Sequence, residues 1–368
     1  MFVYLIMLCA IALIYYFCNK TTGAQKKKNC RFLIFSGILI TLILGSRWDV
    51  YGFADTWMYC ENFDESRLYS LDKFLHKVCK DRDPGYYSMV WVLARIFPNR
   101  QWFIYFECAF LVFSVFLFIY YMTDKPLIAV FLFLGTGIFS FYMSAFRQAF
   151  AFSFCLLSYL LLQKVIKAKE RGNFFRLLIG LAFFYIATTM HKSSIVFIIA
   201  LLICLIKNQK IKILAVVVAA FIIIVFRDAL LSSGNDVMDK EYEIEANFSM
   251  IGFFIQIILF AFPMVLLLLS PKKASLGTAM EQETQYYNLL AISIVAFVFY
   301  ILRLYAQSFE RVAIYFTIAI CSLYPVVFEK TFTKKSQNEL TWIICVVCSA
   351  LLLWRVMDAG SFIFFWQK

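Results

Sequence analysis

Apolar residues fill long stretches of the chain, and most charged residues fall in the breaks between these stretches. A helix needs ~20 apolar residues to cross the ~30 Å hydrocarbon core of a bilayer. Backbone groups in lipid must pair within their own segment, so long apolar stretches predict helices. The pattern predicts about twelve membrane-spanning helices, at residues 2–18, 32–46, 101–122, 126–142, 146–163, 175–190, 193–206, 211–226, 250–270, 286–303, 311–328 and 340–357.

Two apolar stretches need a separate interpretation. Residues 86–97 are too few to cross the bilayer, so this stretch predicts a short interfacial or re-entrant helix. The stretch at residues 2–18 lacks a basic start and a small-residue cleavage site. We therefore expect it to be a retained span rather than a signal peptide.

The composition excludes the main alternatives to a membrane protein. Of the 368 residues, 63% are hydrophobic and 16% are charged, and the mean hydropathy is +0.79. Soluble domains are about half apolar and about a quarter charged, and disordered chains are poorer still in apolar residues. We expect one all-α, multi-pass membrane domain over residues 1–368.

The net charge of +12 predicts the orientation of the chain in the membrane. With the N-terminus outside, the basic loops near residues 26–31, 164–176, 207–212 and 330–335 all lie inside, as the positive-inside rule requires. Both termini are then predicted outside. The basic excess does not indicate nucleic acid, because no zinc knuckle, helix-turn-helix or aromatic RNA-binding motif accompanies it.

The same topology places two long segments on the outer side, at about residues 47–100 and 227–248, whereas the inner loops are short. Function carried by loops is therefore predicted outside. Eleven cysteines form no C-x-x-C pair, so neither a zinc site nor a redox motif is indicated, and the pairing of Cys60 with Cys79 is left open. No Gly-rich phosphate loop or His-rich ligand set occurs, and we expect no metal and no cofactor.

Ionisable side chains near the outer membrane boundary are costly to bury, so each one is a candidate for function. Arg47 ends the second predicted span and opens a segment that contains Asp49, Asp55 and Tyr59. This grouping predicts an anion-binding arginine with a carboxylate nearby. The alternative is an arginine that snorkels at a helix end and pairs with Asp49.

Arg147 and Gln148 begin the span at 146–163, and no acidic residue lies close to them in the sequence. The partner of Arg147 must then come from another helix or from a ligand, and a guanidinium binds phosphate oxygens with two hydrogen bonds. A snorkelling helix end is the alternative. Asp83 precedes Pro84 and Gly85, which by themselves indicate the start of the short helix.

His191 lies between two predicted spans on the outer side. It is a candidate general base or hydrogen-bond donor to a phosphate, or else an interfacial histidine bonded to a neighbouring hydroxyl. Arg303, Glu310 and Arg311 form a third outer cluster, in which Glu310 and Arg311 alternatively pair with each other. Glu107, isolated within a span, is a candidate buried partner for one of the arginines. These residues together predict an outward-facing site for an anion, in an enzyme or a transporter.

These clusters, in this order, resemble the EpsG family of membrane proteins from bacterial polysaccharide operons, which is related to Wzy-type polymerases. The matching residues are, in chain order, Arg47, Gly52, Asp55 and Tyr59; Asp83, Pro84, Gly85 and Tyr86; Arg147 and Gln148; His191 and Ser193; and Glu310 and Arg311 before Tyr315 and Phe316. The family pattern has Gly and Asp nearly adjacent, whereas Gly52 and Asp55 are further apart, so either Asp49 or Asp55 is the family carboxylate.

The resemblance implies a metal-independent polymerase in the bacterial cytoplasmic (inner) membrane, with its active site facing the periplasm or exterior. Such an enzyme transfers a growing glycan from polyprenyl pyrophosphate to the next lipid-linked repeat unit and makes exopolysaccharide, capsule or O-antigen. A flippase and a chain-length regulator of the same pathway are the implied protein partners. On this basis Arg147, Arg47 and Arg311 bind the pyrophosphate, and His191 or Asp55 orients or deprotonates the acceptor hydroxyl. The remaining predicted substrate-binding residues are Asp49, Tyr59, Asp83, Gln148, Arg303 and Glu310.

Three other functions fit part of the pattern. A flippase or transporter of the same lipid-linked glycan needs a polar route through the bilayer, but the middle of each span is apolar, and no internal repeat is visible. A membrane acyltransferase with His191 as its base needs a donor from the cytoplasm, whereas His191 is predicted outside. A ligase that uses the same donor cannot be told from a polymerase by sequence.

Overall fold

In a computed structural model of the chain, the residues described are 2–48, 55–167, 173–229, 232, 250–269, 280–358 and 364. Apart from an isolated bridge between Arg47 and Phe364, the regular elements of these residues are helices. They are α1 Phe2–Lys20, α2 Gln25–Gly45, α3 Thr56–Leu68, α4 Leu71–Lys80, α5 Pro84–Ile96, α6 Arg100–Met122, α7 Pro126–Gly135, α8 Ile138–Ser144, α9 Phe146–Lys167, α10 Asn173–Met190, the 3-10 helix η1 Lys192–Phe197, α11 Ile198–Leu205, α12 Gln209–Val225, α14 Met250–Leu269, α15 Met280–Leu302, α16 Ser308–Thr331 and α17 Lys334–Asp358.

The all-helical, multi-span architecture predicted from the hydropathy pattern is confirmed. Eight described helices are long and apolar enough to cross a membrane: α1, α2, α6, α9, α14, α15, α16 and α17. The bent pair α7 and α8 gives up to nine, and α10 and the η1–α11 segment are shorter apolar helices. The number twelve, the sidedness and the placement of both termini stay predictions.

The span predicted at residues 126–142 is not one continuous helix. The chain forms α7 and α8, which are bent by 51° relative to each other. Gly137 stands between them with a φ of +87°, a left-handed conformation that glycine adopts without a steric penalty. The Gly137 backbone therefore breaks the span that hydropathy alone joins.

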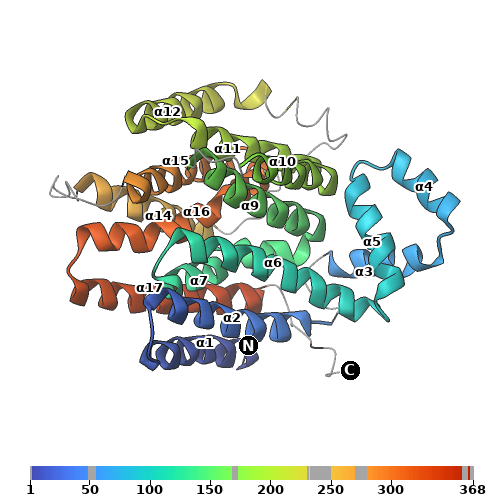
Figure 1. Ribbon diagram of the computed structural model, residues 1–368, viewed down its shortest axis with the longest axis horizontal. Coiled ribbons are helices and arrows are strands. Elements are labelled where there is room, and N and C mark those ends of the chain that lie inside the picture. The colour runs from blue at the N-terminus through green and yellow to red at the C-terminus, as the bar shows by residue number, and fades with distance from the viewer. Residues whose placement is uncertain are drawn as a thin grey trace. The chain divides into compact units, whose positions relative to one another are not determined.

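The chain divides into two compact units. The first unit comprises the residues up to Ile195 and those from Thr341 onward. Within it α6 packs against α2 and α9, and α9 pairs with α10. Helices α3, α4 and α5 follow one another beside the start of α6 (Figure 1). This helical lobe accounts for most of the outer segment predicted at residues 47–100, including a short helix, α5, where one was expected.

The second unit comprises Val196–Leu340. Helices α15 and α16 form its central pair, and α11, α12 and α14 pack around them. Lys212 of α12 is fully buried and donates a hydrogen bond to Asn288 of α15.

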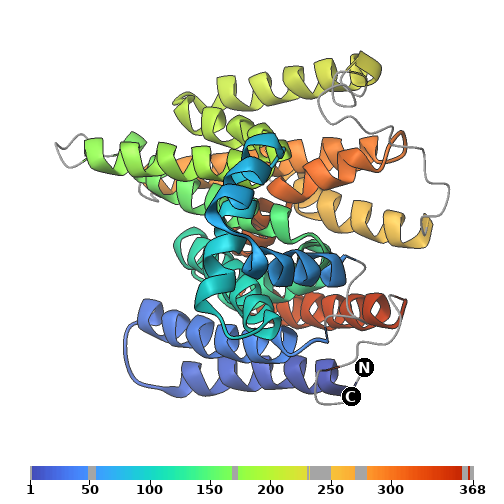
Figure 2. The same cartoon turned by 90° about the vertical axis from the view of Figure 1, so that its right-hand side faces the viewer.

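Figure 2 shows α1 and α2 of the first unit side by side, joined by a short loop. Each unit therefore carries its own set of apolar helices.

A buried aromatic cluster in the first unit holds the lobe to the long helices. It joins α3, α5, α6, α9 and α10, and Tyr59, Phe63, Tyr86, Phe103 and Phe146 are among its members. The Tyr59 ring stacks on Phe146, with ring centroids 4.9 Å apart. This packing fixes the beginnings of α3, α5 and α9 relative to one another, and the candidate site lies at that junction.

Candidate active site

Asp83 stands at the N-cap of α5, and Pro84 occupies the first helical turn, where its missing N–H costs nothing. The Asp83 side chain does not cap its own helix. Its Oδ2 instead accepts a hydrogen bond from Arg147 Nη1 of α9, at 2.8 Å. The helix-start interpretation is thus correct for Pro84, while the Asp83 carboxylate provides the partner that the sequence around Arg147 lacks.

His191, just after α10, shares the same carboxylate. Its Nδ1 lies 3.2 Å from Asp83 Oδ2, and the backbone N–H of Lys192 donates to Oδ1 at 3.3 Å. An ionised carboxylate can only accept, so the imidazole hydrogen is on Nδ1. The other ring nitrogen, Nε2, then carries the lone pair.

Gln148 faces that second ring nitrogen. Its side-chain Nε2 lies 2.9 Å from His191 Nε2 and 3.4 Å from Ser193 Oγ. The amide therefore donates to His191 in the ligand-free arrangement and has Ser193 as a second acceptor within reach. Asp83, Arg147, Gln148 and His191, four residues predicted from sequence, are thus brought together from three helices.

Gly85 allows this close approach. A Cβ at Gly85 would lie 2.2 Å from Thr189 Oγ1 and 3.0 Å from the Thr189 backbone carbon. Any larger residue would push the start of α5 away from the end of α10, and with it Asp83 away from His191. The Gly85 of the sequence motif therefore serves helix packing as well as the turn.

The site is partly exposed to solvent, and the charges of Asp83 and Arg147 offset each other. The Asp83 side chain is 4% exposed, while those of Arg147 and His191 are 28% and 22% exposed. Burial would raise the pKa of Asp83, but the hydrogen bond and charge of His191, the charge of Arg147 and the Lys192 N–H hold it below its usual value. Asp83 is therefore an ionised carboxylate that orients its neighbours, not a proton donor at neutral pH.

Tyr59 of α3 adds a hydroxyl to the cluster, within hydrogen-bonding reach of Arg147. Burial raises the pKa of Tyr59, and Arg147 only partly offsets this effect. Asp55, at the N-cap of α3, is exposed and acts electrostatically on Tyr59. Tyr59 is thus a neutral hydroxyl that accepts from the guanidinium. Asp49 lies outside the described residues.

Arg47 has a different environment. Its side chain and that of Glu107 are both 0% exposed, and Arg47 Nη2 pairs with Glu107 Oε2 at 3.0 Å. Arg47 also donates to the Leu44 carbonyl and lies over the Phe146 ring. The structure therefore encloses this predicted phosphate ligand with Glu107, the candidate buried partner, and we leave Arg47 out of the proposed substrate-binding set.

The remaining predicted cluster belongs to the second unit. Arg303 Nε and Glu310 Oε2 are 2.9 Å apart, so Arg303 is an ion-pair partner of Glu310. Arg311 begins α16 and is exposed. The part of these three residues in substrate binding stays a prediction.

The cysteine and carboxylate patterns do not form further sites in the described part of the chain. Cys60 is buried in the aromatic cluster and Cys79 is exposed on α4, and no disulfide joins them. Asp81 and Asp83 have a D-x-D spacing, and the Asp81 carboxylate accepts the backbone N–H of Asp83. No group of three or more His, Cys, Asp or Glu among the described residues is placed to hold a metal ion.

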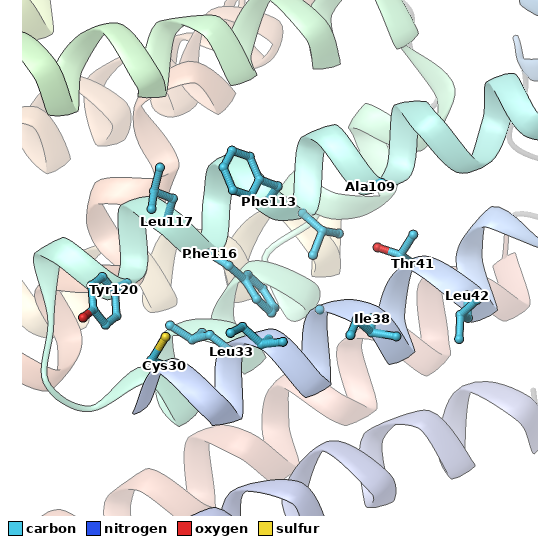
Figure 3. Close-up of a pocket in the computed structure, with 13 residues that line it drawn as sticks. Cys30, Leu33, Ile38, Thr41, Leu42, Ala109, Phe113, Phe116, Leu117 and Tyr120 are labelled. Atoms are coloured by element: carbon cyan, nitrogen blue, oxygen red, sulfur yellow. The ribbon is translucent and has the colours of Figure 1, made fainter. Parts of the chain in front are cut away.

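An apolar groove of about 510 Å³ lies elsewhere on the first unit, between α2 and α6. Leu33 and Ile38 line it from α2, and Phe113 and Phe116 from α6 (Figure 3). The lining suits hydrocarbon and offers no charged group to a phosphate. This groove is therefore not a candidate site for an anion.

The described residues define a helical membrane protein in which one buried carboxylate pairs with an imidazole and a guanidinium, a grouping typical of functional sites. The chain belongs to the EpsG family, whose model matches residues 30–367. This family is associated with polysaccharide biosynthesis. No curated protein and no solved structure matches the chain.

Proposed function

We propose that the protein polymerises lipid-linked glycan repeat units, with a polyprenyl-diphosphate-linked glycan as donor. The observation that carries this proposal is the Asp83 carboxylate shared by Arg147 and His191. It joins a cation suited to phosphate to an imidazole held in one orientation, which are the two functions that this transfer needs. Membership of the EpsG family supports a glycan as the substrate.

In the proposed reaction a sugar hydroxyl of the acceptor unit attacks the anomeric carbon of the donor glycan. The new glycosidic bond forms as the bond from that carbon to the diphosphate oxygen breaks, and the diphosphate leaves with the electron pair. The proton of the hydroxyl passes to His191 Nε2. Arg147 binds the diphosphate and stabilises the charge that develops on it.

The contacts of His191 support its role as the base. Asp83 accepts from Nδ1 and stabilises the imidazolium that forms when Nε2 takes a proton. The acceptor hydroxyl replaces the Gln148 amide at Nε2, and Gln148 then donates to Ser193. Asp55, exposed beside Tyr59, is the candidate to hold the acceptor sugar.

We place the site on the outer face of the bacterial cytoplasmic membrane, because the basic loops favour that orientation. A flippase would then deliver the lipid-linked units, and a chain-length regulator would act on the product.

Deletion of the gene in its native host, followed by a gel that resolves repeat-unit ladders, tests this function. We expect the ladder to collapse to a single exported unit and to return with the wild-type gene but not with Arg147→Ala. Arg100→Ala is the matched control, since Arg100 forms a more exposed pair with Asp64 at 3.4 Å. Loss of all exported material would instead indicate a flippase, and an intact ladder with altered decoration an acyltransferase.

A further inference from the structure

Lys77 of α4 approaches the active-site face of α5, although sequence patterns gave it no role. Its Nζ lies 5.1 Å from the centroid of the Tyr87 ring and donates to the Tyr69 hydroxyl at 3.2 Å. Tyr87 follows Asp83 by one helical turn, so both residues lie on the same face of α5. A second cation therefore stands one turn from the carboxylate that holds Arg147.

The packing of α4 on α5 enforces this position. Phe74 of α4 stacks on Trp91 of α5, with ring centroids 4.4 Å apart. The two helices are joined by a link of only a few residues and run back along each other (Figure 1). One turn forward from Phe74 is Lys77, and one turn back from Trp91 is Tyr87. The aromatic stack therefore brings the ammonium group of Lys77 to Tyr87.

Lys77 and Arg147 both act electrostatically on the Tyr87 phenol. Burial and the charge of Asp81 raise the pKa of Tyr87, and both cations work against that rise. Burial would lower the pKa of Lys77, but the hydrogen bond to Tyr69 and the neighbouring Tyr87 and Glu65 hold it above its usual value. Lys77 is thus firmly cationic, and no carboxylate among the residues described forms an ion pair with it.

The charge balance favours an anion at this position. Asp83 already neutralises part of the Arg147 charge, so Arg147 alone is a weak match for a diphosphate, which carries more than one negative charge. We propose that Lys77, between Tyr69 and Tyr87, is a second anion subsite that binds one phosphate of the diphosphate while Arg147 binds the other. This inference rests on the proposed function and names the residue that distinguishes a diphosphate from a monophosphate.

Binding of farnesyl diphosphate and farnesyl monophosphate to the purified full-length protein in detergent tests this subsite. We expect Lys77→Ala to weaken diphosphate binding about tenfold, as for the loss of one charge-assisted hydrogen bond, and to change monophosphate binding less than about twofold. Lys77→Arg should keep most of the diphosphate affinity. Lys73→Ala is the matched control, because Lys73 lies 4.5 Å over the Tyr69 ring on the same helix but has no contact with Tyr87.

The outcomes separate the subsite from the proposed function. Unchanged diphosphate binding in Lys77→Ala, with binding lost in Arg147→Ala, would overturn the subsite and leave the function standing. Equal weakening of both probes, or an equal effect of Lys73→Ala, would also overturn it, because either result indicates a general charge effect. If the wild-type protein binds neither probe, the diphosphate donor is wrong and the subsite falls with it. Normal diphosphate binding with lost elongation of an acidic glycan would assign Lys77 to a sugar carboxylate instead.

Discussion

Two arginines of the first unit each pair with a carboxylate far away in the sequence, yet their environments differ. Arg47 and Glu107 are wholly enclosed, and the Arg47 guanidinium is also held by a backbone carbonyl and an aromatic ring. Arg147 pairs with an almost buried Asp83 but keeps 28% of its own side chain exposed. The comparison teaches that an arginine at a membrane boundary is a candidate for binding only when its pairing leaves part of it open to a ligand.

The buried pair should dominate stability. Arg47→Met leaves the Glu107 carboxylate buried without its cation, which costs about 3–5 kcal/mol. We expect a large loss of thermal stability and of monodisperse protein in detergent. The double variant Arg47→Met with Glu107→Leu should regain most of that loss, since it removes both charges. A single variant as stable as the wild type would contradict the structural role of Arg47.

Substitutions in the partly exposed Arg147–Asp83 pair should have the largest effect on activity. Arg147→Ala should lower the transfer rate by ~10²–10³, as removal of a transition-state donor does, while stability changes far less than in Arg47→Met. Arg147→Lys should fall between, because an ammonium group cannot form the two parallel hydrogen bonds of a guanidinium. Transfer rates and melting temperatures of the same preparations separate the two effects. If Arg147→Ala and Arg47→Met lost equal stability, the two ion pairs would not differ in their structural role.

A larger residue at Gly85 should disturb the site around Asp83 and His191 but not the buried Arg47–Glu107 pair. Gly85→Ala should push α5 away from Thr189 and lower the rate by up to ~10², since a displacement of about 1 Å in a catalytic group has this effect. Thr189→Ala in the same chain should restore part of the activity, because it removes the nearest clashing atom. A fully active Gly85→Ala protein would show that the Asp83–His191 contact tolerates displacement.

Most of the fold could be predicted from the sequence because a long apolar stretch in a membrane must form a helix. Each predicted span coincides with a helix or a pair of short helices. The break at Gly137 was missed because backbone conformation, not hydrophobicity, causes it. The lobe of α3, α4 and α5 was visible only as one short helix within a polar segment.

The site was predicted in part. Arg147, lacking any nearby acid, required a distant partner, and Asp83 and His191 were candidates, but their convergence depends on tertiary packing. Arg47 was also a candidate, as an arginine near the outer boundary with acidic residues nearby in the sequence, but its complete burial with Glu107 separates it from Arg147. Lys77 was missed because its helix has the basic, amphipathic sequence of an ordinary exposed helix, and only the Phe74–Trp91 stack in the structure shows where it packs. The signal in the sequence was that Lys77 follows Phe74 by three residues, so both lie on one face of the helix.

Acid should weaken the Arg147–Asp83 pair through Asp83. Because the folded-state pKa of Asp83 lies below its usual value of 3.8, the unfolded chain binds the proton more readily. The stability that Asp83 contributes is complete above that usual value and is lost as pH falls through the lower folded-state pKa. Melting temperatures of the wild type should therefore fall more steeply than those of Asp83→Asn on acidification from about pH 5 to pH 3. Parallel curves would contradict the charged state of Asp83.

The smallest effects should come from the exposed edge of the site. Tyr59→Phe removes one hydroxyl that accepts from Arg147 and should lower the rate by about tenfold, the range of one hydrogen bond to a charged group. Asp55→Asn should reduce elongation with a full acceptor unit but leave diphosphate binding unchanged. A loss in Asp55→Asn as large as that in Arg147→Ala would instead make Asp55 the catalytic carboxylate.

The most direct test of the central claim is release of polyprenyl diphosphate by the purified protein in proteoliposomes supplied with lipid-linked repeat units from the native host. The wild type should release one diphosphate lipid for each glycosidic bond formed, and Arg147→Ala and His191→Ala should each lower both quantities together while remaining folded. Release and elongation at the wild-type rate in either folded variant would show that the Asp83, Arg147 and His191 cluster is not the site of glycan transfer.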